Sequence, residues 1–151
     1  MARTYRLGLG RRLINVLATP LIRLGLAPRG SHLLTTVGRR TGQPRTNPVH
    51  LIDDDRNRYL VAPYGVVSWV RNARAAGEVT LTRGRNSSRH SVTEVGAAEA
   101  APVLKRYVQE IAVTRPFLDV TKDAPVTAFE AEVADHPVFR LGPARSQLVD
   151  S

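Results

Sequence analysis

The chain has 151 residues, 42% of them hydrophobic, which suits one domain that buries its own core without a disulfide or a structural metal. It contains no cysteine, so disulfide frameworks, thiolate metal sites and cysteine nucleophiles are excluded and a reduced, cytoplasmic setting is expected. The net charge of +9 is unevenly placed, because residues 1–52 hold nine of the 22 basic residues and no acidic residue. This distribution favours anionic partners.

Residues 1–26 predict a basic amphipathic helix, in which leucine and isoleucine recur at helical spacing between arginines. The helix either packs on its own domain or makes peripheral contact with a membrane surface. A helix that spans a bilayer needs about 18 consecutive apolar residues, and the sequence contains no such run. We assign residues 1–30 to this helix and its connection, and residues 31–151 to the rest of a single-domain protein.

Six short runs rich in valine, leucine, threonine and tyrosine predict strands, at residues 31–37, 47–53, 57–63, 78–84, 89–95 and 136–142. Residues 53–57 and 83–88 are predicted hairpin turns. Two helices interrupt the strands: a short one that Ser68 is expected to cap and Gly77 to end, and a longer one over about residues 99–113. The order predicts a mainly β, α+β fold, a six-stranded antiparallel barrel with helices plugging its ends.

Signatures of common catalytic classes are absent from the sequence. It has no G-x-S-x-G elbow, no H-E-x-x-H helix, no phosphate-binding P-loop and no complete Rossmann fingerprint. The four histidines fall on different predicted strands without ligand spacing, and Asp53–Asp55 fits a polar turn better than a magnesium site, so no metal site is predicted. Either the protein only binds, or a cofactor supplies the chemistry.

Two segments carry the candidate binding residues. The first, "GRRTG" at residues 38–42 with Arg45 after it, is either a solvated basic turn or a cradle of backbone N–H groups and guanidinium groups for an anion. The second, "APYGVVSWVRN" at residues 62–72, leads from a strand into a helix on which Trp69 and Asn72 share a face. Trp69 is equally explained as a core residue.

Together, "LLTTVGRRTGQPRTNPV" (33–49) and "VAPYGVVSWVRNARAAGEVTL" (61–81) resemble the deazaflavin-dependent nitroreductase family of actinobacteria. Members are split β-barrel, FMN-binding-like oxidoreductases that use coenzyme F420. The resemblance implies that the phosphate and acidic tail of F420 bind to Gly38, Arg39, Arg40, Thr41, Gly42 and Arg45. It implies that the deazaflavin ring and its linker are lined by Pro48, Ala62, Pro63, Tyr64 and Gly65, and that the tail site is shaped by Trp69, Arg71 and Asn72. Tyr64 and Ser68 are the candidate catalytic residues, as proton donors to the substrate.

The implied reaction is hydride transfer from reduced F420 to an electron-poor small molecule, which is an enone, a quinone or a nitro compound. The family's nitroreductases carry a tyrosine-rich segment after the long helix, whereas "TRPFLDVTKDAP" (114–125) has Phe117 and no tyrosine. This difference weighs against a nitro compound as the substrate.

Three alternatives to this reaction stay open. The first alternative is a relative that uses FMN. The second is a non-catalytic protein that binds F420 or a fatty acid, and the third is a protein that binds a membrane surface. Binding of nucleic acid is not expected, because none of the eight aromatic residues alternates with arginine on one strand face as a stacking platform requires. A homodimer is expected, because split barrels often pair through their sheets.

Overall fold

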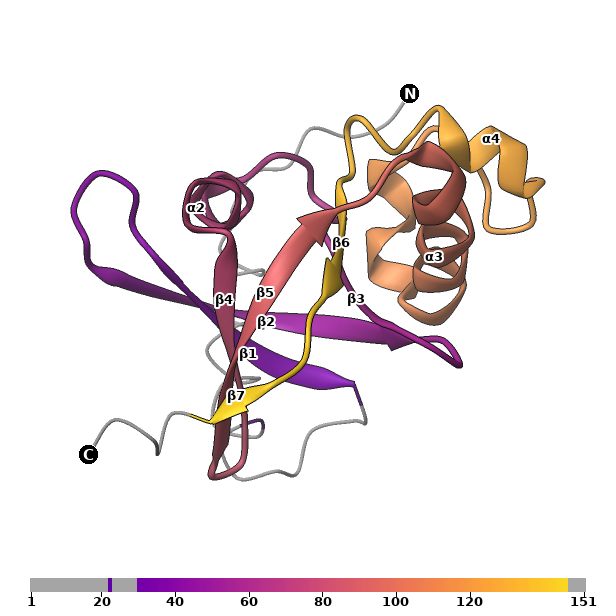
Figure 1. Ribbon diagram of the computed structural model, residues 1–151. Coiled ribbons are helices and arrows are strands. Elements are labelled where there is room, and N and C mark those ends of the chain that lie inside the picture. Colours follow the sequence, from indigo (N-terminus) through magenta and orange to yellow (C-terminus); the bar gives the residue numbers. More distant parts are fainter. Residues whose placement is uncertain (1–21, 23–29, 147–151) are drawn as a thin grey trace.

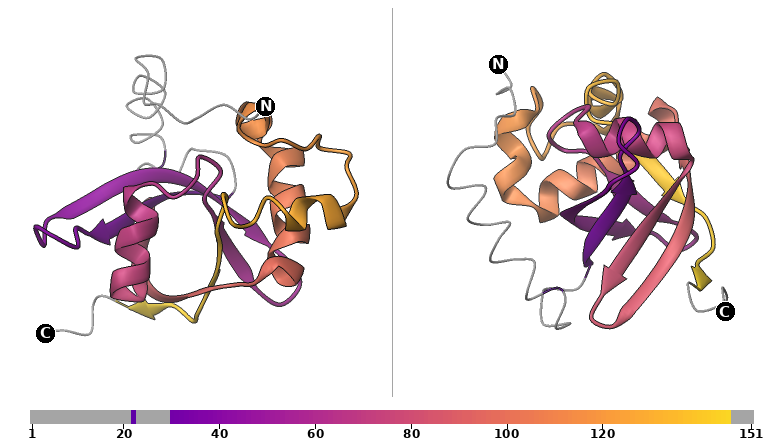
Figure 2. Two further views of the ribbon diagram at one scale, coloured as in Figure 1. Left: turned by 90° about the horizontal axis from the view of Figure 1, so that it is seen from above. Right: turned by 90° about the vertical axis from the view of Figure 1, so that its left-hand side faces the viewer.

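The computed structural model describes Ile22 and residues 30–146, and within this part six antiparallel strands close into a barrel (Figures 1 and 2). The strands pair in the order β4-β1-β2-β3-β6-β5, and β5 pairs back onto β4, which closes the ring. Their bounds are β1 Ser31–Val37, β2 Pro44–Asp53, β3 Arg58–Val61, β4 Glu78–Arg83, β5 Asn86–Glu94 and β6 Val138–Leu141. The predicted six-stranded antiparallel split barrel is confirmed. A further two-residue strand that was not predicted, β7 (Arg145–Ser146), pairs with β5.

The two longest strands, β2 and β5, each belong to both halves of the barrel. Residues 44–50 of β2 pair with β1, and residues 51–53 pair with β3. In the same way, β5 pairs first with β4 and then with β6. Closure of the ring by these shared strands leaves none of the six with an edge open along its whole length.

The short strand β3 is buried on both of its faces, which explains where the helices lie. Leu60 points into the barrel, where Trp69 of α2 (Ser68–Ala76) belongs to the same core cluster. Tyr59 and Val61 point outward and pack with α3 (Ala97–Glu110). The expectation that the helices plug the barrel ends is therefore right for α2 and wrong for α3, because the apolar outer face of β3 needs a cover (Figure 2).

The local signals at turns and helix ends are mostly confirmed. The carboxylate of Asp54 accepts the backbone N–H groups of Arg56 and Asn57 at 2.8 and 2.6 Å, which closes the β2–β3 turn. Gly77 ends α2 with a φ of 73°. The capping role expected of Ser68 is wrong, because Val67 occupies the N-cap position and Ser68 is already the first helical residue.

Two short helical elements were not predicted, because neither is long enough to show a helical period: η1 (Ala112–Phe117) and α4 (Val126–Glu130). Because η1 follows directly, α3 ends at Glu110, before the predicted end at residue 113. The N-terminal helix expected over residues 1–26 lies outside the described residues except for Ile22, which is helical and buried against Leu33. Among the described helices, none has both the length and the apolar character needed to cross a bilayer.

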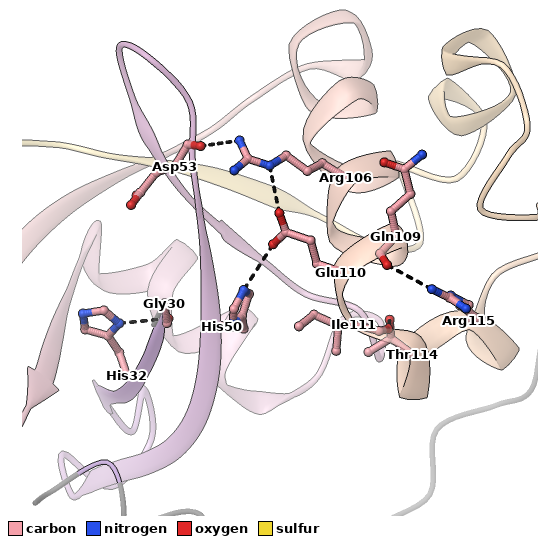
Figure 3. A network of polar contacts seen from close by, with 10 residues as sticks. All are labelled: Gly30, His32, His50, Asp53, Arg106, Gln109, Glu110, Ile111, Thr114 and Arg115. Atoms are coloured by element: carbon pink, nitrogen blue, oxygen red, sulfur yellow. Dashed lines mark hydrogen bonds and ion pairs between the residues drawn. The ribbon is translucent and has the colours of Figure 1, made fainter. Parts of the chain in front are cut away.

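A polar network fixes the end of α3 to β2 (Figure 3). The Glu110 carboxylate lies 3.4 Å from Nε2 of His50 and accepts a 3.0 Å hydrogen bond from Nε of Arg106. Arg106 also donates through Nη1 to the backbone carbonyl of Asp53. These contacts hold α3 across the outer surface of the barrel.

Candidate functional site

A pocket of about 450 Å³ lies between the β1–β2 hairpin and α2. It joins the two segments that the sequence singled out, whose lining residues are about twenty positions apart along the chain. Its lining residues are Gly38, Arg39, Arg40, Thr41, Arg45, Thr46, Asn47, Ser68, Trp69 and Asn72.

The β1–β2 turn is compact because two glycines allow the backbone to close. The N–H of Gly38 donates to the carbonyl of Gln43 at 2.8 Å, and the N–H of Gly42 donates to the carbonyl of Gly38 at 2.8 Å. Gly42 has a φ of 71°, which a residue with a side chain adopts only with strain. A Cβ on Gly38 would lie 2.8 Å from Oγ1 of Thr41. The turn therefore needs glycine at both positions.

Asn72 ties this turn to α2 and is only 2% exposed. Its Oδ1 accepts the backbone N–H of Arg39 at 3.2 Å and the Nη1 of the same residue at 2.9 Å. Its Nδ2 donates to Oγ1 of the buried Thr36 at 3.2 Å. The amide thus fixes the position of Arg39 in the pocket wall.

The pocket is strongly positive. Arg39, Arg40 and Arg45 line it, and no acidic residue does. The guanidinium groups of Arg40 and Arg45 form no hydrogen bond or ion pair with another residue in the described part of the chain. A phosphate or carboxylate in the pocket would gain charge-assisted hydrogen bonds of about 1.5–3 kcal/mol each.

Trp69 is a core residue that also faces the pocket. It is 8% exposed, and its ring centroid lies 6.0 Å from that of Phe139 inside the barrel. It also forms part of the pocket lining. Ser68, the preceding residue, is exposed and lines the same pocket.

Seven of the predicted cofactor residues are not part of this pocket lining: Gly42, Pro48, Ala62, Pro63, Tyr64, Gly65 and Arg71. Ala62 and Pro63 are buried, and Arg71 is exposed on α2. The ring of Tyr64 packs edge-on against Phe117 with centroids 5.0 Å apart. The roles of these seven residues stay predictions.

Sequence reasoning missed two lining residues, Thr46 and Asn47. They directly follow Arg45 on β2, and Oγ1 of Thr46 lies 3.0 Å from Oγ1 of Thr35. They could have been predicted from their position, because they follow Arg45, a predicted site residue, at the start of a strand.

The chemistry of the lining fits a cofactor with an acidic end. Guanidinium groups from the turn and the second strand of the β1–β2 hairpin line a space with no competing carboxylate. F420 carries a phosphate and an acidic tail, so the arginine side of the pocket suits that part of the molecule. In the described residues, no group of histidine and acidic side chains could hold a metal ion.

Comparison with solved structures supports the fold. A structure described as F420-H2 dependent reductase (FDR-A) is 21% identical and has a TM-score of 0.52, with 75% of this chain and 94% of that chain covered. A structure described as a domain-swapped dimer is 18% identical with a TM-score of 0.54, covering 87% and 98%. HutZ from Vibrio cholerae, described as a heme storage protein, is 13% identical with a TM-score of 0.56, covering 84% and 90%. Among curated proteins, none matches this chain.

The family described as F420H(2)-dependent quinone reductase matches residues 19–129, which include both segments of the pocket. This match confirms the cofactor, F420, and the reaction class, an F420H2-dependent reductase, that the sequence resemblance implied. The chain therefore belongs to the F420H(2)-dependent quinone reductase family.

Proposed function

We propose that the protein transfers a hydride from reduced F420 to an electron-poor small molecule, with a quinone as the first candidate and an enone or a nitro compound as the others. The observation that carries this proposal is the pocket between the hairpin and α2, in which three arginines meet without a carboxylate. The name of the matched family supports a quinone as the acceptor.

The acidic tail of F420 is assigned to the arginine side of the pocket. Arg40 and Arg45 are the primary anion ligands, because neither guanidinium is engaged with another described residue. Arg39 donates to Asn72 through Nη1 and so presents its remaining N–H groups from a fixed position. The full set proposed for the tail is Gly38, Arg39, Arg40, Thr41, Gly42, Arg45, Trp69, Arg71 and Asn72.

The ring is assigned to Pro48 and the loop between β3 and α2. In this loop Ala62 and Pro63 are buried, Gly65 has a φ of 96°, and its N–H donates to the carbonyl of Ala62 at 3.3 Å. A loop held in this way changes little on binding, which favours precise placement of a flat ring.

When bound, reduced F420 supplies the hydride, and the protein contributes binding, orientation and exclusion of water. Tyr64 and Ser68 are the proposed proton donors to the acceptor. Contact with Phe117 restrains the ring of Tyr64, and the hydroxyl of Ser68 is exposed beside the arginines. Of the two, Tyr64 is favoured, because it lies in the loop assigned to the ring.

A homodimer is proposed for the assembly. The support is the likeness in fold to a structure described as a domain-swapped dimer. Analytical ultracentrifugation tests this proposal, and a single species of 16.6 kDa at all concentrations would reject it.

The proposed function is tested by titrating the purified protein with F420 and, in parallel, with FMN, following the fluorescence of each. We expect saturable binding of F420 and weaker binding of FMN. Reduced F420 is then mixed with a naphthoquinone, cyclohexenone or a nitroaromatic compound, and the return of oxidised F420 is followed by absorbance. No binding of F420, or tighter binding of FMN, would reject the proposal.

A further inference from the structure

A second pocket, of about 440 Å³, opens at the other end of the barrel, beside the β4–β5 turn. It shares no lining residue with the pocket near α2. Strand β1 runs from one pocket to the other, and at about 3.3 Å per residue its length separates them by about 20 Å. Figure 1 shows α2 and the β4–β5 turn at opposite ends of β4. The lining residues are His32, Arg58, Leu81, Arg83, Gly84, Arg85, Asn86, Ser88 and His90.

Several of these residues point into the barrel rather than away from it. Successive side chains of a strand alternate between faces, so residues two apart point the same way. Three strands place a basic residue two positions from a leucine of the barrel core: His32 and Leu34 on β1, Arg58 and Leu60 on β3, and Arg83 and Leu81 on β4. These three strands therefore place basic side chains at this end of the barrel, and on β2 the equivalent position, two residues from Leu51, is Asp53.

The pairing of the strands brings these side chains together. Leu33 pairs with Thr82, so the register of β1 and β4 sets His32 beside Arg83. Arg83 is fixed there by a 2.8 Å hydrogen bond from its Nη1 to the carbonyl of Ser31. Arg85 is exposed at the tip of the turn that follows.

No acidic residue lines this pocket. Arg58 is partly neutralised, because the Asp53 carboxylate accepts from its Nε at 2.7 Å. Arg83 donates to the carbonyl of Ser31, and the guanidinium of Arg85 makes no hydrogen bond or ion pair with another described residue. Guanidinium groups beside a space that no carboxylate lines favour an anionic ligand, which would gain charge-assisted hydrogen bonds from them.

The two histidines are held in defined tautomers by carbonyl partners. Nδ1 of His32 lies 3.0 Å from the carbonyl of Gly30, and Nδ1 of His90 lies 2.9 Å from the carbonyl of Gly142, so each Nδ1 carries the proton. Nε2 of His90 accepts from the hydroxyl of Ser88 at 2.9 Å. Burial lowers the pKa of His32, so its Nε2 is an acceptor at neutral pH.

We propose that this mouth of the barrel is a second anion site, separate from the F420 site, which binds a phosphate group through Arg83 and Arg85. Nε2 of His32 accepts a hydrogen bond from a hydroxyl of the same ligand. The ligand is either a free phosphorylated molecule or the phosphate of an anionic lipid. The N–H of Gly84, at the rim, donates to the carbonyl of Ile22 at 2.8 Å.

The test is an NMR titration of the full chain with inorganic phosphate, read at the backbone amides of Gly84, Arg85 and Asn86. We expect saturable shifts at these amides. Arg85→Gln should weaken the binding by about fivefold or more, as expected for loss of a charge-assisted hydrogen bond. Arg56 is exposed and does not line the pocket, so Arg56→Gln should change the affinity for phosphate by less than about twofold.

Two further titrations distinguish a free phosphorylated ligand from a lipid headgroup. One uses glucose 6-phosphate, and the other uses vesicles of phosphatidylglycerol in phosphatidylcholine. Saturable shifts with the sugar phosphate support a free ligand, and broadening with these vesicles but not with pure phosphatidylcholine supports a lipid headgroup. Shifts that rise linearly without saturation, or that are unchanged in Arg85→Gln, would overturn the proposal. Arg85 lies at an exposed turn, so its substitution leaves the core intact.

Discussion

A single amide oxygen of Asn72 holds Arg39 at two points, accepting from its backbone nitrogen at 3.2 Å and from its Nη1 at 2.9 Å. The two residues lie 33 positions apart, one on α2 and the other in the β1–β2 hairpin. The arginine-rich turn and the helix are therefore parts of one site, and the asparagine acts by positioning the arginine.

The first prediction concerns Asn72→Ala. It removes the partner of Arg39 and leaves the buried hydroxyl of Thr36 without its donor, so the free energy of unfolding should fall by about 1–3 kcal/mol. The Kd for F420 should rise, because Arg39 is no longer fixed. Urea unfolding and fluorescence titration measure the two effects. Gln109→Ala, which removes a surface hydrogen bond to the carbonyl of Lys122, is the matched control and should leave F420 binding unchanged.

The second prediction separates the three arginines of the pocket. Arg40→Gln and Arg45→Gln should each raise the Kd for F420 by about tenfold or more without changing stability, because neither guanidinium binds another described residue. Arg39→Gln should weaken binding and lower stability together. Titration at several salt concentrations should show a shallower salt dependence for each variant. Equal affinity in Arg40→Gln, Arg45→Gln and the control Arg56→Gln would contradict the assignment of the tail.

The third prediction concerns the shape of the turn. In Gly38→Ala the new Cβ would lie 2.8 Å from Oγ1 of Thr41 and 3.1 Å from the carbonyl oxygen of Gln43, so the turn must shift and F420 binding should weaken. Gly96→Ala is the control, because its Cβ meets nothing within 4 Å and Gly96 lies outside the pocket. Unchanged affinity in Gly38→Ala would show that the turn does not contact the cofactor.

The fourth prediction concerns acid stability. The guanidinium of Arg140 donates to Glu99 at 2.8 and 2.9 Å and, with the hydroxyl of Tyr59, lowers the pKa of this carboxyl below its ordinary value of 4.5. Because the pKa is lower in the folded state, the stabilisation is present above pH 4.5 and is lost as the pH falls through the folded value.

Glu99→Gln should therefore be less stable than the unchanged protein at pH 7, and the difference should shrink at pH values below the folded pKa. Thermal unfolding of both proteins across this range measures the effect. Glu130→Gln, at an exposed position of α4, is the control and should show no such convergence. A difference in stability that is independent of pH would contradict the role given to the Glu99–Arg140 pair.

The sequence by itself determined the places of the six strands, the β2–β3 turn and both segments of the pocket, whereas the turn predicted over residues 83–88 is limited to residues 84 and 85 between paired strands. Alternating apolar residues specify strands, and residues such as Asp54 and Gly77 specify turns and helix ends, through contacts made within a few positions of the chain. The cap at the start of α2 was one exception. Val67 and Ser68 both precede the helical pattern, and only the backbone geometry decides which of them is the N-cap.

Tertiary structure alone decided which distant residues meet. The placement of α3 on the outer face of β3, the hold of Asn72 on Arg39 and the basic mouth with Arg58, Arg83 and Arg85 all depend on the closure of the barrel. In the sequence, these last arginines are only charges at turns and strand ends. That Arg83 lies beside His32 of β1 follows from strand register, which is set by pairing between strands and not by any local pattern.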